Sequence, residues 1–356
     1  MTYKDSINVL LENVPEHILS YDPNHTVNKP TQASSDFLIN KEQGDWAEEV
    51  VFNFINRGFT NQYRAVRYGK NDDKVAGEDG FNEFYYNYQE ELRKIGKRPD
   101  LLIYESGAVA NDDISRKSPA DIDNIVKQAK AGFEVRSSSF LTEKYFEDIE
   151  KRVEQAEKVI KSSIQKIKQL ASLQKITFNN TWQQFLNKDL PNDLRDIEIP
   201  AFRGEMTQSP ELMEIKDELK KSINILKRRH TLSFTPKVED IYAIARWVNI
   251  YNVPHYYVQV FFDKIYAISF KRILEIISDS NNQNKIFTIE RNRKNQMKQT
   301  IHIDIHQGEI IGEINELPPI EGKMRKLARG RLLFYIGFGE STGMIYKEKF
   351  RDLING

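Results

Sequence analysis

Two stretches of the sequence decide the fold: Arg98–Tyr104 (RPDLLIY) and Gly132–Phe140 (GFEVRSSSF). Each contains a short apolar run of the kind that forms a buried β-strand. Asp100 stands at the start of the first run, and Glu134 lies inside the second. If the two runs pair as neighbouring strands, both carboxylates come to one place. The sequence therefore predicts a pair of acidic residues within the core of a sheet.

The residue types around this pair indicate a chemistry. Two close carboxylates repel each other at neutral pH unless a cation neutralises them, and hard oxygen ligands suit Mg²⁺. Arg136 follows Glu134 by two residues and adds a positive charge, as in a metal-dependent phosphodiesterase. A structural interpretation stays open, in which Asp100 caps a turn and Glu134 forms an ion pair with Arg136 or Arg98. An unpaired buried carboxylate is costly, so Glu134 requires some partner.

The composition is that of an ordinary folded protein. The chain has 356 residues, of which 39% are hydrophobic and 29% charged, enough to bury a large core. It contains no apolar run long enough to span a membrane, and its first residues lack the pattern of a signal peptide. The lack of cysteine excludes disulfides and thiol catalysis and fits the cytoplasm of a prokaryote. The 52 basic and 52 acidic residues cancel, so any surface for nucleic acid must be local.

Hydrophobic periodicity divides the chain into three parts: 1–141, the first part of an α/β core; 142–230, a helical insertion; and 231–356, the remainder of the core. The expected helices cover Lys41–Arg57, Phe81–Ile95, Thr142–Gln174, Pro210–Lys227 and Lys271–Ser278. A further helix is expected from Pro236, with Thr235 as its cap, to about Tyr251. The expected strands are Leu101–Tyr104, Phe133–Arg136, His255–Asp263, Ile265–Phe270, Lys285–Ile289, Thr300–Ile305 and Leu332–Ile336.

The order of these elements (helix, strand with Asp, strand with Glu-x-basic, helix, strand, strand) resembles the PD-(D/E)XK nuclease core. More closely, the chain resembles the AccI-type type II restriction endonucleases. The residues that carry this resemblance lie in 44–48 (GDWAE), 96–103 (GKRPDLLI), 134–138 (EVRSS) and 256–263 (YYVQVFFD). The resemblance covers roughly residues 41–140 and 231–271. It implies a mixed sheet flanked by helices.

The resemblance also implies an activity. It implies Mg²⁺-dependent, site-specific cleavage of double-stranded DNA by a homodimer, with a cognate DNA methyltransferase acting on the same site. Asp100 and Glu134 would bind the metal, with the carbonyl of Val135 as a further ligand, and Glu48 would orient a water from its helix. The family pattern has lysine where this chain has Arg136, and an arginine cannot act as a base, so we interpret Arg136 as a phosphate clamp. For Glu48 the alternative is an ordinary solvated glutamate, with Glu49 as a rival.

Basic residues supply candidate DNA contacts, because clustered cations attract phosphates. These candidates are Lys97, Arg98, Arg291, Arg293, Lys294, Arg325 and Arg329; a solvated charged surface is the alternative explanation for each cluster. The residues at 291–294 and 325–329 would make 231–356 a DNA-contacting part, and the insertion 142–230 would serve as a DNA clamp or for dimerisation. Two rival functions remain open: a structure-selective repair or recombination nuclease, and a DNA-binding protein that has lost catalysis, suggested by Arg136 in the lysine position.

Overall fold

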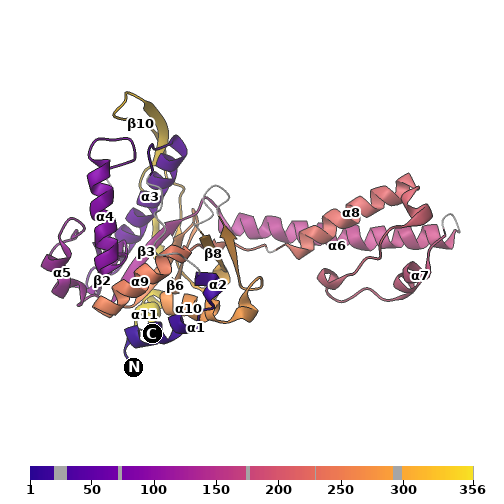
Figure 1. Ribbon diagram of the computed structural model, residues 1–356, viewed down its shortest axis with the longest axis horizontal. Coiled ribbons are helices and arrows are strands. Elements are labelled where there is room, and N and C mark those ends of the chain that lie inside the picture. Colours follow the sequence, from indigo (N-terminus) through magenta and orange to yellow (C-terminus); the bar gives the residue numbers. More distant parts are fainter. Residues whose placement is uncertain (20–29, 71–73, 174–176, 229, 292–298, 356) are drawn as a thin grey trace. The chain divides into compact units, whose positions relative to one another are not determined.

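The computed structural model describes residues 1–19, 30–70, 74–173, 177–228, 230–291 and 299–355. The chain folds into two compact units (Figure 1). The first combines Met1–Thr142 with Leu232–Gly356, and the second is Glu143–Thr231. We call them the sheet unit and the helical unit. Among the described residues, no helix combines the length and the apolar character needed to cross a membrane.

A seven-stranded mixed sheet with the order β1-β2-β3-β5-β6-β9-β12 forms the centre of the sheet unit. Strands β3 and β5 run parallel, whereas the other neighbours are antiparallel. The strand bounds are Tyr63–Arg67, Leu101–Glu105, Ala131–Ser137, His255–Val260, Lys264–Ser269, Glu309–Ile314 and Gly343–Ile345. Two smaller sheets accompany it: β4 (Ser233–Phe234) with β8 (Gln299–Asp304) and β7 (Phe287–Arg291), and the pair β10 (Ile320–Lys326) with β11 (Leu332–Phe338).

One face of the large sheet is apolar and is covered by α3 (Ser35–Gly58) and α11 (Lys347–Asn355). The Ser34 side chain accepts a hydrogen bond from the Phe37 N–H and so caps the start of α3. The apolar positions of α3, among them Trp46 and Val50, pack in one cluster with Phe133 and Val135 of β3. Because side chains alternate along a strand, Glu134 and Arg136 must point to the opposite face.

Helices α4 (Phe81–Ile95), α9 (Val238–Tyr251) and α10 (Phe270–Ser278) belong to that opposite side, with α1 (Tyr3–Asn13) beyond them. Trp247 of α9 is fully buried, and its Nε1–H donates to the Tyr68 hydroxyl at 3.2 Å. A Cβ on Gly132 would lie 3.2 Å from the Trp247 ring and 2.7 Å from Pro99, so β3, α9 and the Pro99–Asp100 turn approach each other at a glycine. Short helices α2 (Glu16–Leu19) and α5 (Pro119–Val126) complete this unit.

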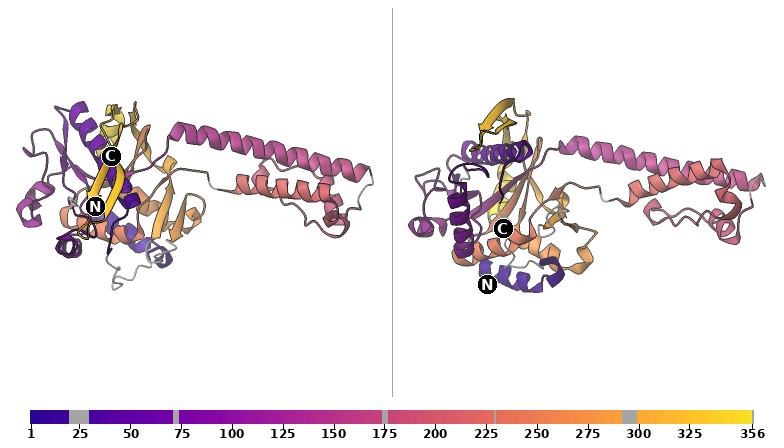
Figure 2. Two further views of the ribbon diagram at one scale, coloured as in Figure 1. Left: turned by 90° about the horizontal axis from the view of Figure 1, so that it is seen from above. Right: turned by 45° about the horizontal axis from the view of Figure 1, so that its top comes forward.

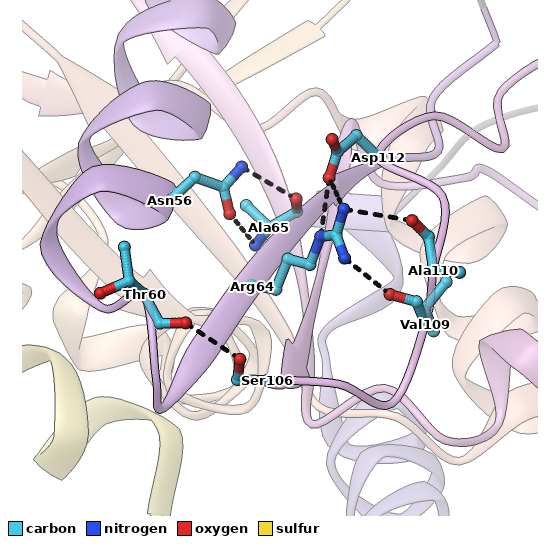
Figure 3. A network of polar contacts seen from close by, with 8 residues as sticks. All are labelled: Asn56, Thr60, Arg64, Ala65, Ser106, Val109, Ala110 and Asp112. Atoms are coloured by element: carbon cyan, nitrogen blue, oxygen red, sulfur yellow. Dashed lines mark hydrogen bonds and ion pairs between the residues drawn. The ribbon is translucent and has the colours of Figure 1, made fainter.

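The edge strand β1 is tied to its surroundings by side chains, which fixes the position of its neighbour β2 (Figure 3). The Asn56 amide pairs with both backbone groups of Ala65, at 2.9 and 3.1 Å. Arg64 forms an ion pair with Asp112 and donates to the backbone carbonyl of Val109 at 2.9 Å. These contacts satisfy edge groups that would otherwise be open to another strand.

The helical unit has a hydrophobic core of its own, built from α6 (Thr142–Ser172), α7 (Asn180–Asn187) and α8 (Pro210–Lys227). In this unit α6 and α8 lie side by side (Figure 2). Trp182 of α7 is fully buried, and its Nε1–H donates to the Ala201 carbonyl at 3.1 Å. Two short 3₁₀ turns, Leu194–Asp196 and Gly204–Thr207, connect α7 to α8.

The structure confirms most expected elements and corrects several. The bounds expected for α4 and α8 are those observed, and β5 pairs with β6 as expected, although β5 ends at Val260 rather than Asp263. The prediction that α9 starts at Pro236 with a Thr235 cap is wrong. Instead Pro236 accepts a hydrogen bond from the Ile301 N–H, so this segment stays extended beside β8 and the helix begins at Val238. Strands β1, β4, β9, β10 and β12 and helix α11 were not predicted.

Candidate active site

The two carboxylates of the opening stretches meet on one face of the sheet. Strands β2 and β3 are antiparallel neighbours with Leu101 opposite Phe133, so Asp100 and Glu134 are also opposed. The backbone N–H of Val135 donates to Asp100 Oδ2 at 2.7 Å. Both carboxylates lie on the side away from α3. The expected pairing of the two strands is therefore confirmed, and the short helix α5 lies between them in the chain.

The backbone around Asp100 is held from both sides. The N–H groups of Tyr68 and Gly69 both donate to the Asp100 carbonyl, at 2.9 and 3.0 Å. A Cβ on Gly69 would lie only 2.9 Å from the Asp100 Cα and 3.2 Å from its Oδ1. The end of β1 thus needs a glycine in order to approach the carboxylate so closely. This contact fixes Asp100 before any ligand arrives.

Glu134 is fully buried, and two cationic side chains contact it. Lys97 Nζ lies 2.7 Å from Glu134 Oε1, and Arg136 Nη2 lies 2.5 Å from the same oxygen. The ion pair with Arg136 that the sequence left open is therefore present. The alternative pair with Arg98 is not, because the Arg98 Nε lies 2.6 Å from Glu91 Oε1 instead. A buried charge needs such neutralisation, because desolvation alone would penalise it heavily.

Asp240, which sequence reasoning missed, joins the two cations. It lies in the first turn of α9, with Oδ2 2.6 Å from Lys97 Nζ and 3.4 Å from Arg136 Nη2. The only signal in the sequence was an acidic pair, Glu239-Asp240, at a helix start, where the helix dipole favours negative charge anyway. Asp100, Glu134, Arg136, Lys97 and Asp240 are called the charged cluster below.

The two opposed carboxylates have pKa values displaced in opposite directions. Burial and the neighbouring Glu134 charge raise the pKa of Asp100 to about 7, against 3.8 for an ordinary aspartate. Burial also works against ionisation of Glu134, but the charges of Arg136 and Lys97 outweigh it and lower the pKa of that carboxyl. Glu134 is therefore ionised at neutral pH, whereas Asp100 is partly protonated near pH 7.

Three polar side chains of β5 extend this face. His255, Tyr257 and Gln259 alternate along the strand, and Tyr257 is opposite Glu134 in the parallel pair. All three are buried, and both His255 nitrogens, the Tyr257 hydroxyl and the Gln259 Oε1 have no hydrogen-bond partner among the described residues. Burial lowers the pKa of His255 to about 4, so its imidazole is neutral. The site thus has a polar floor that sequence reasoning treated only as a β-prone strand.

The donor set fits a hard divalent cation that keeps part of its water. Glu134 Oε2 is buried and has no hydrogen-bond partner in the part of the chain that the structure describes, whereas the cations contact Oε1. Asp100 is directly opposite. Within the described ranges no group of three or more His, Cys, Asp or Glu side chains could hold a metal ion. Two carboxylates with water and substrate oxygens are the usual protein environment of Mg²⁺.

Comparison with protein families now gives this site a context. The model of the AccI restriction endonuclease family matches residues 1–355. The chain belongs to this family. It is therefore a type II restriction enzyme, a site-specific deoxyribonuclease that cleaves DNA. No curated protein and no solved structure matches the chain.

For an AccI-family enzyme, the position of Glu48 is informative. Glu48 lies on α3 between the buried residues Ala47 and Val50, and α3 covers the apolar face of the sheet. The charged cluster lies on the other face. The adjacent Glu49 forms an ion pair with Arg67 and accepts a hydrogen bond from Asn53 at 2.7 Å. Neither glutamate shares a layer with Glu134.

The candidate DNA-contacting residues of this enzyme lie in different environments. Arg98 is buried, donates to the Ser115 and Lys117 carbonyls and lies 5.0 Å from the Tyr68 ring, so the structure places it inside the protein instead of on a DNA-facing surface. Lys97 belongs to the charged cluster. Arg325 is paired with Glu78 at 2.6 Å, whereas Arg329 is exposed. Arg293 and Lys294 lie outside the described residues, and Arg291 ends β7.

Proposed function

We propose that this enzyme cleaves double-stranded DNA with Mg²⁺ held by Asp100 and Glu134, on a PD-(D/E)XK core. The observation that carries the proposal is the opposition of the two carboxylates on β2 and β3, with a free Glu134 oxygen between buried neighbours. The sheet order β1-β2-β3-β5, with β3 and β5 parallel, supports such a core. The carbonyl of Val135 is a further candidate ligand, because the Val135 N–H already docks on Asp100.

The residues divide the work as follows. A divalent cation bound here would stabilise charge on the phosphate and lower the pKa of the water that attacks it. Asp100 and Glu134 supply the negative charge that attracts it. Arg136 is the most accessible of the cations, with 28% of its side chain exposed, and it can clamp a phosphate oxygen. It cannot accept a proton from water, since guanidinium keeps its proton throughout the physiological range.

The assembly and the helical unit belong to the same proposal. We expect a homodimer, because a two-fold symmetric enzyme matches a two-fold symmetric DNA site. The helical unit would act as a DNA clamp or as a dimer contact. Light scattering of the full chain, alone and with a cognate duplex, measures this directly. A monomer in both conditions would contradict the dimer.

Digestion of a plasmid with and without Mg²⁺ tests the function. Discrete fragments that vanish with a chelator are expected. Cleavage confined to branched or nicked DNA would favour a repair nuclease, and tight binding without cleavage would favour an inactive binder. Asp100→Asn should abolish cleavage while leaving the fold intact. The matched control is Glu49→Gln, which removes an ion-paired carboxylate from the opposite face of the same sheet.

A further inference from the structure

Two members of the charged cluster, Lys97 and Asp240, come from outside the Asp and Glu-x-basic motif. Lys97 precedes that motif, and Asp240 follows the helical unit in sequence. Their mutual distance of 2.6 Å and the 2.7 Å contact of Lys97 with Glu134 bring both to the reacting centre. The side chain of Lys97 is 14% exposed and that of Asp240 is 17% exposed. They are neither free surface charges nor fully enclosed.

The backbone at Lys97 is built to keep this contact. Gly96 has φ +80°, and a Cβ there would lie 2.1 Å from the Ala243 carbonyl of α9. The Lys97 N–H donates to that same carbonyl at 3.0 Å. A non-glycine residue would push the chain off α9, so this turn is fixed by a close approach. Behind it, Arg98 is anchored to Glu91 at 2.6 Å.

The hydrogen-bonding capacity of Lys97 leaves room for a ligand. An ammonium group has three N–H donors. Its contacts with Glu134 and Asp240 use two of them, which leaves one for a group entering from the exposed side. The ammonium group lies between two carboxylates, those of Glu134 and Asp240, and this setting favours its charged form. It is suited to stabilise negative charge, and not to remove a proton.

We propose that Lys97 is a catalytic residue that contacts the scissile phosphate, and that Asp240 is the positioning residue that holds it beside Glu134. This inference rests on the proposed function of Asp100 and Glu134. Lys97 donates its third N–H to a non-bridging phosphate oxygen and keeps its proton during the reaction. Water adds across the broken P–O bond, with its hydroxyl on phosphorus and its proton on the leaving oxygen. Arg136, which is more exposed, contacts an adjacent phosphate oxygen.

This division explains the arginine in the motif. Two cations share one Glu134 oxygen, and only one of them can sit closest to the reacting phosphate. A lysine ammonium is compact, whereas guanidinium is a wide planar fork suited to bidentate contacts. The less exposed Lys97 therefore takes the inner position and Arg136, at 28% side-chain exposure, the outer one. Loss of lysine from the motif does not imply loss of catalysis.

The test compares Lys97→Met with a matched control, Lys130→Met, which removes a lysine ion-paired with Glu105 just before the start of β3. We expect Lys97→Met to slow single-turnover cleavage by about 100-fold, the effect of removing one charge-stabilising donor. In metal-free binding to cognate duplex, the slope of log affinity against log salt should fall by about 0.9, the signature of one lost phosphate contact. Lys130→Met should change neither quantity.

Asp240→Asn tests the positioning role. We expect it to slow cleavage about 10-fold, as for other outer contacts that orient a reactive group. Because Asp240 acts through Lys97, the double variant should cleave no more slowly than Lys97→Met alone. Additive losses would overturn the positioning role. Lys97→Arg should cleave faster than Lys97→Met, because it restores the charge.

The outcomes separate this inference from the proposed function. Suppose that the wild type cleaves and Glu134→Gln does not. If Lys97→Met then cleaves at the wild-type rate, or if its salt slope equals that of the wild type, only this inference is wrong. If Glu134→Gln also cleaves normally, the proposed function is wrong. Thermal melting shows whether each variant folds. If Lys97→Met does not fold, Lys97→Arg and Asp240→Asn decide: wild-type rates in both would overturn the inference.

Discussion

The sheet unit and the helical unit differ in whether their charged side chains are buried or exposed. The sheet unit brings five ionisable side chains together, one of them the fully buried Glu134. The helical unit has an aliphatic and aromatic core, and the buried polar residues among its described part are only Ser163 and Ser222. Its ion pairs, such as Asp148–Arg152 on α6 and Asp193–Arg195, lie on the exposed surface.

This difference teaches where function lies. Replacing a buried ion cluster by apolar residues is often neutral or stabilising, so stability alone does not explain such a cluster. Perturbed pKa values are common at functional sites, because the burial and charge that chemistry requires also displace them. By this criterion we propose that the catalytic chemistry belongs to the sheet unit and that the helical unit serves binding or assembly. Each experiment below tests this division of roles between the two units.

The largest effect is expected for Glu134→Gln. It keeps the shape of the side chain but removes the charge that Lys97 and Arg136 neutralise. Cleavage should fall by at least about 1000-fold, since a binding group for the metal and the anchor of two cations are lost together. Single-turnover rates measure this loss, and Glu49→Gln is the control. Retained cleavage with Glu134→Gln would place the chemistry elsewhere.

A large effect on stability is expected for Trp182→Ala in the helical unit. Trp182 is fully buried, with Phe202 and Phe185 rings at 5.0 and 5.5 Å. Truncation should cost about 3–5 kcal/mol through lost burial and the cavity left behind. Hydrogen exchange should show the loss in residues 143–231 and not around Glu134. Trp182→Phe should cost less. An equal loss of protection in both units would show that they unfold as one.

The sequence was sufficient to predict the features that depend on residues close together in the chain. The motif located Asp100 and Glu134, and helical periodicity predicted that α8 starts at Pro210. It failed for β1, whose polar and aromatic residues reflect an edge strand tied by side chains such as Arg64. It also failed at Pro236, where pairing with Ile301 overrides a good helix-start signal.

The rest of the charged cluster could not be read from the sequence for a physical reason. Lys97 and Asp240 are 143 residues apart, and their contact depends on the docking of α9 on the turn at Gly96. No local pattern reports such a distance. A lysine before a strand and an acidic residue in a first helical turn both have ordinary surface explanations. Only the sheet and α9 together distinguish them from surface charges.

A smaller effect, on the pH dependence of stability, is expected at His255. Its pKa is 6.5 in an unfolded chain and about 4 here, because burial disfavours the imidazolium. As the pH falls from about 6.5 to about 4, only the unfolded chain takes up this proton, so the stability that His255 contributes is lost, up to ~3 kcal/mol. His255→Phe keeps the ring contact with Phe270 and removes the titration.

The measurement is the difference between wild type and His255→Phe in the free energy of unfolding from pH 7 to pH 4. The difference is needed because Asp100 acts with the opposite sign. Its pKa is raised to about 7 in the folded state, so the folded chain takes up a proton below that pH and gains stability down to about 3.8. Parallel curves for the two proteins would show that His255 is not held neutral by burial.

The smallest effect is expected on α6, and it sharpens the comparison most directly. Arg152 pairs with Asp148 at 2.8 Å, about as close as Arg136 to Glu134, but the two side chains of the α6 pair are 64% and 59% exposed. Solvent and salt screen such a pair, so Arg152→Gln should cost less than about 0.5 kcal/mol, and the cost should vanish in high salt.

Arg136→Gln breaks a contact of similar length with a fully buried carboxylate and should slow cleavage and destabilise the sheet unit at any salt concentration. Thermal melting of both variants at low and high salt compares them. A salt-sensitive loss at Arg136 would mean that the charged cluster is open to solvent, and the contrast between the two units would then be one of position on the surface and not of burial.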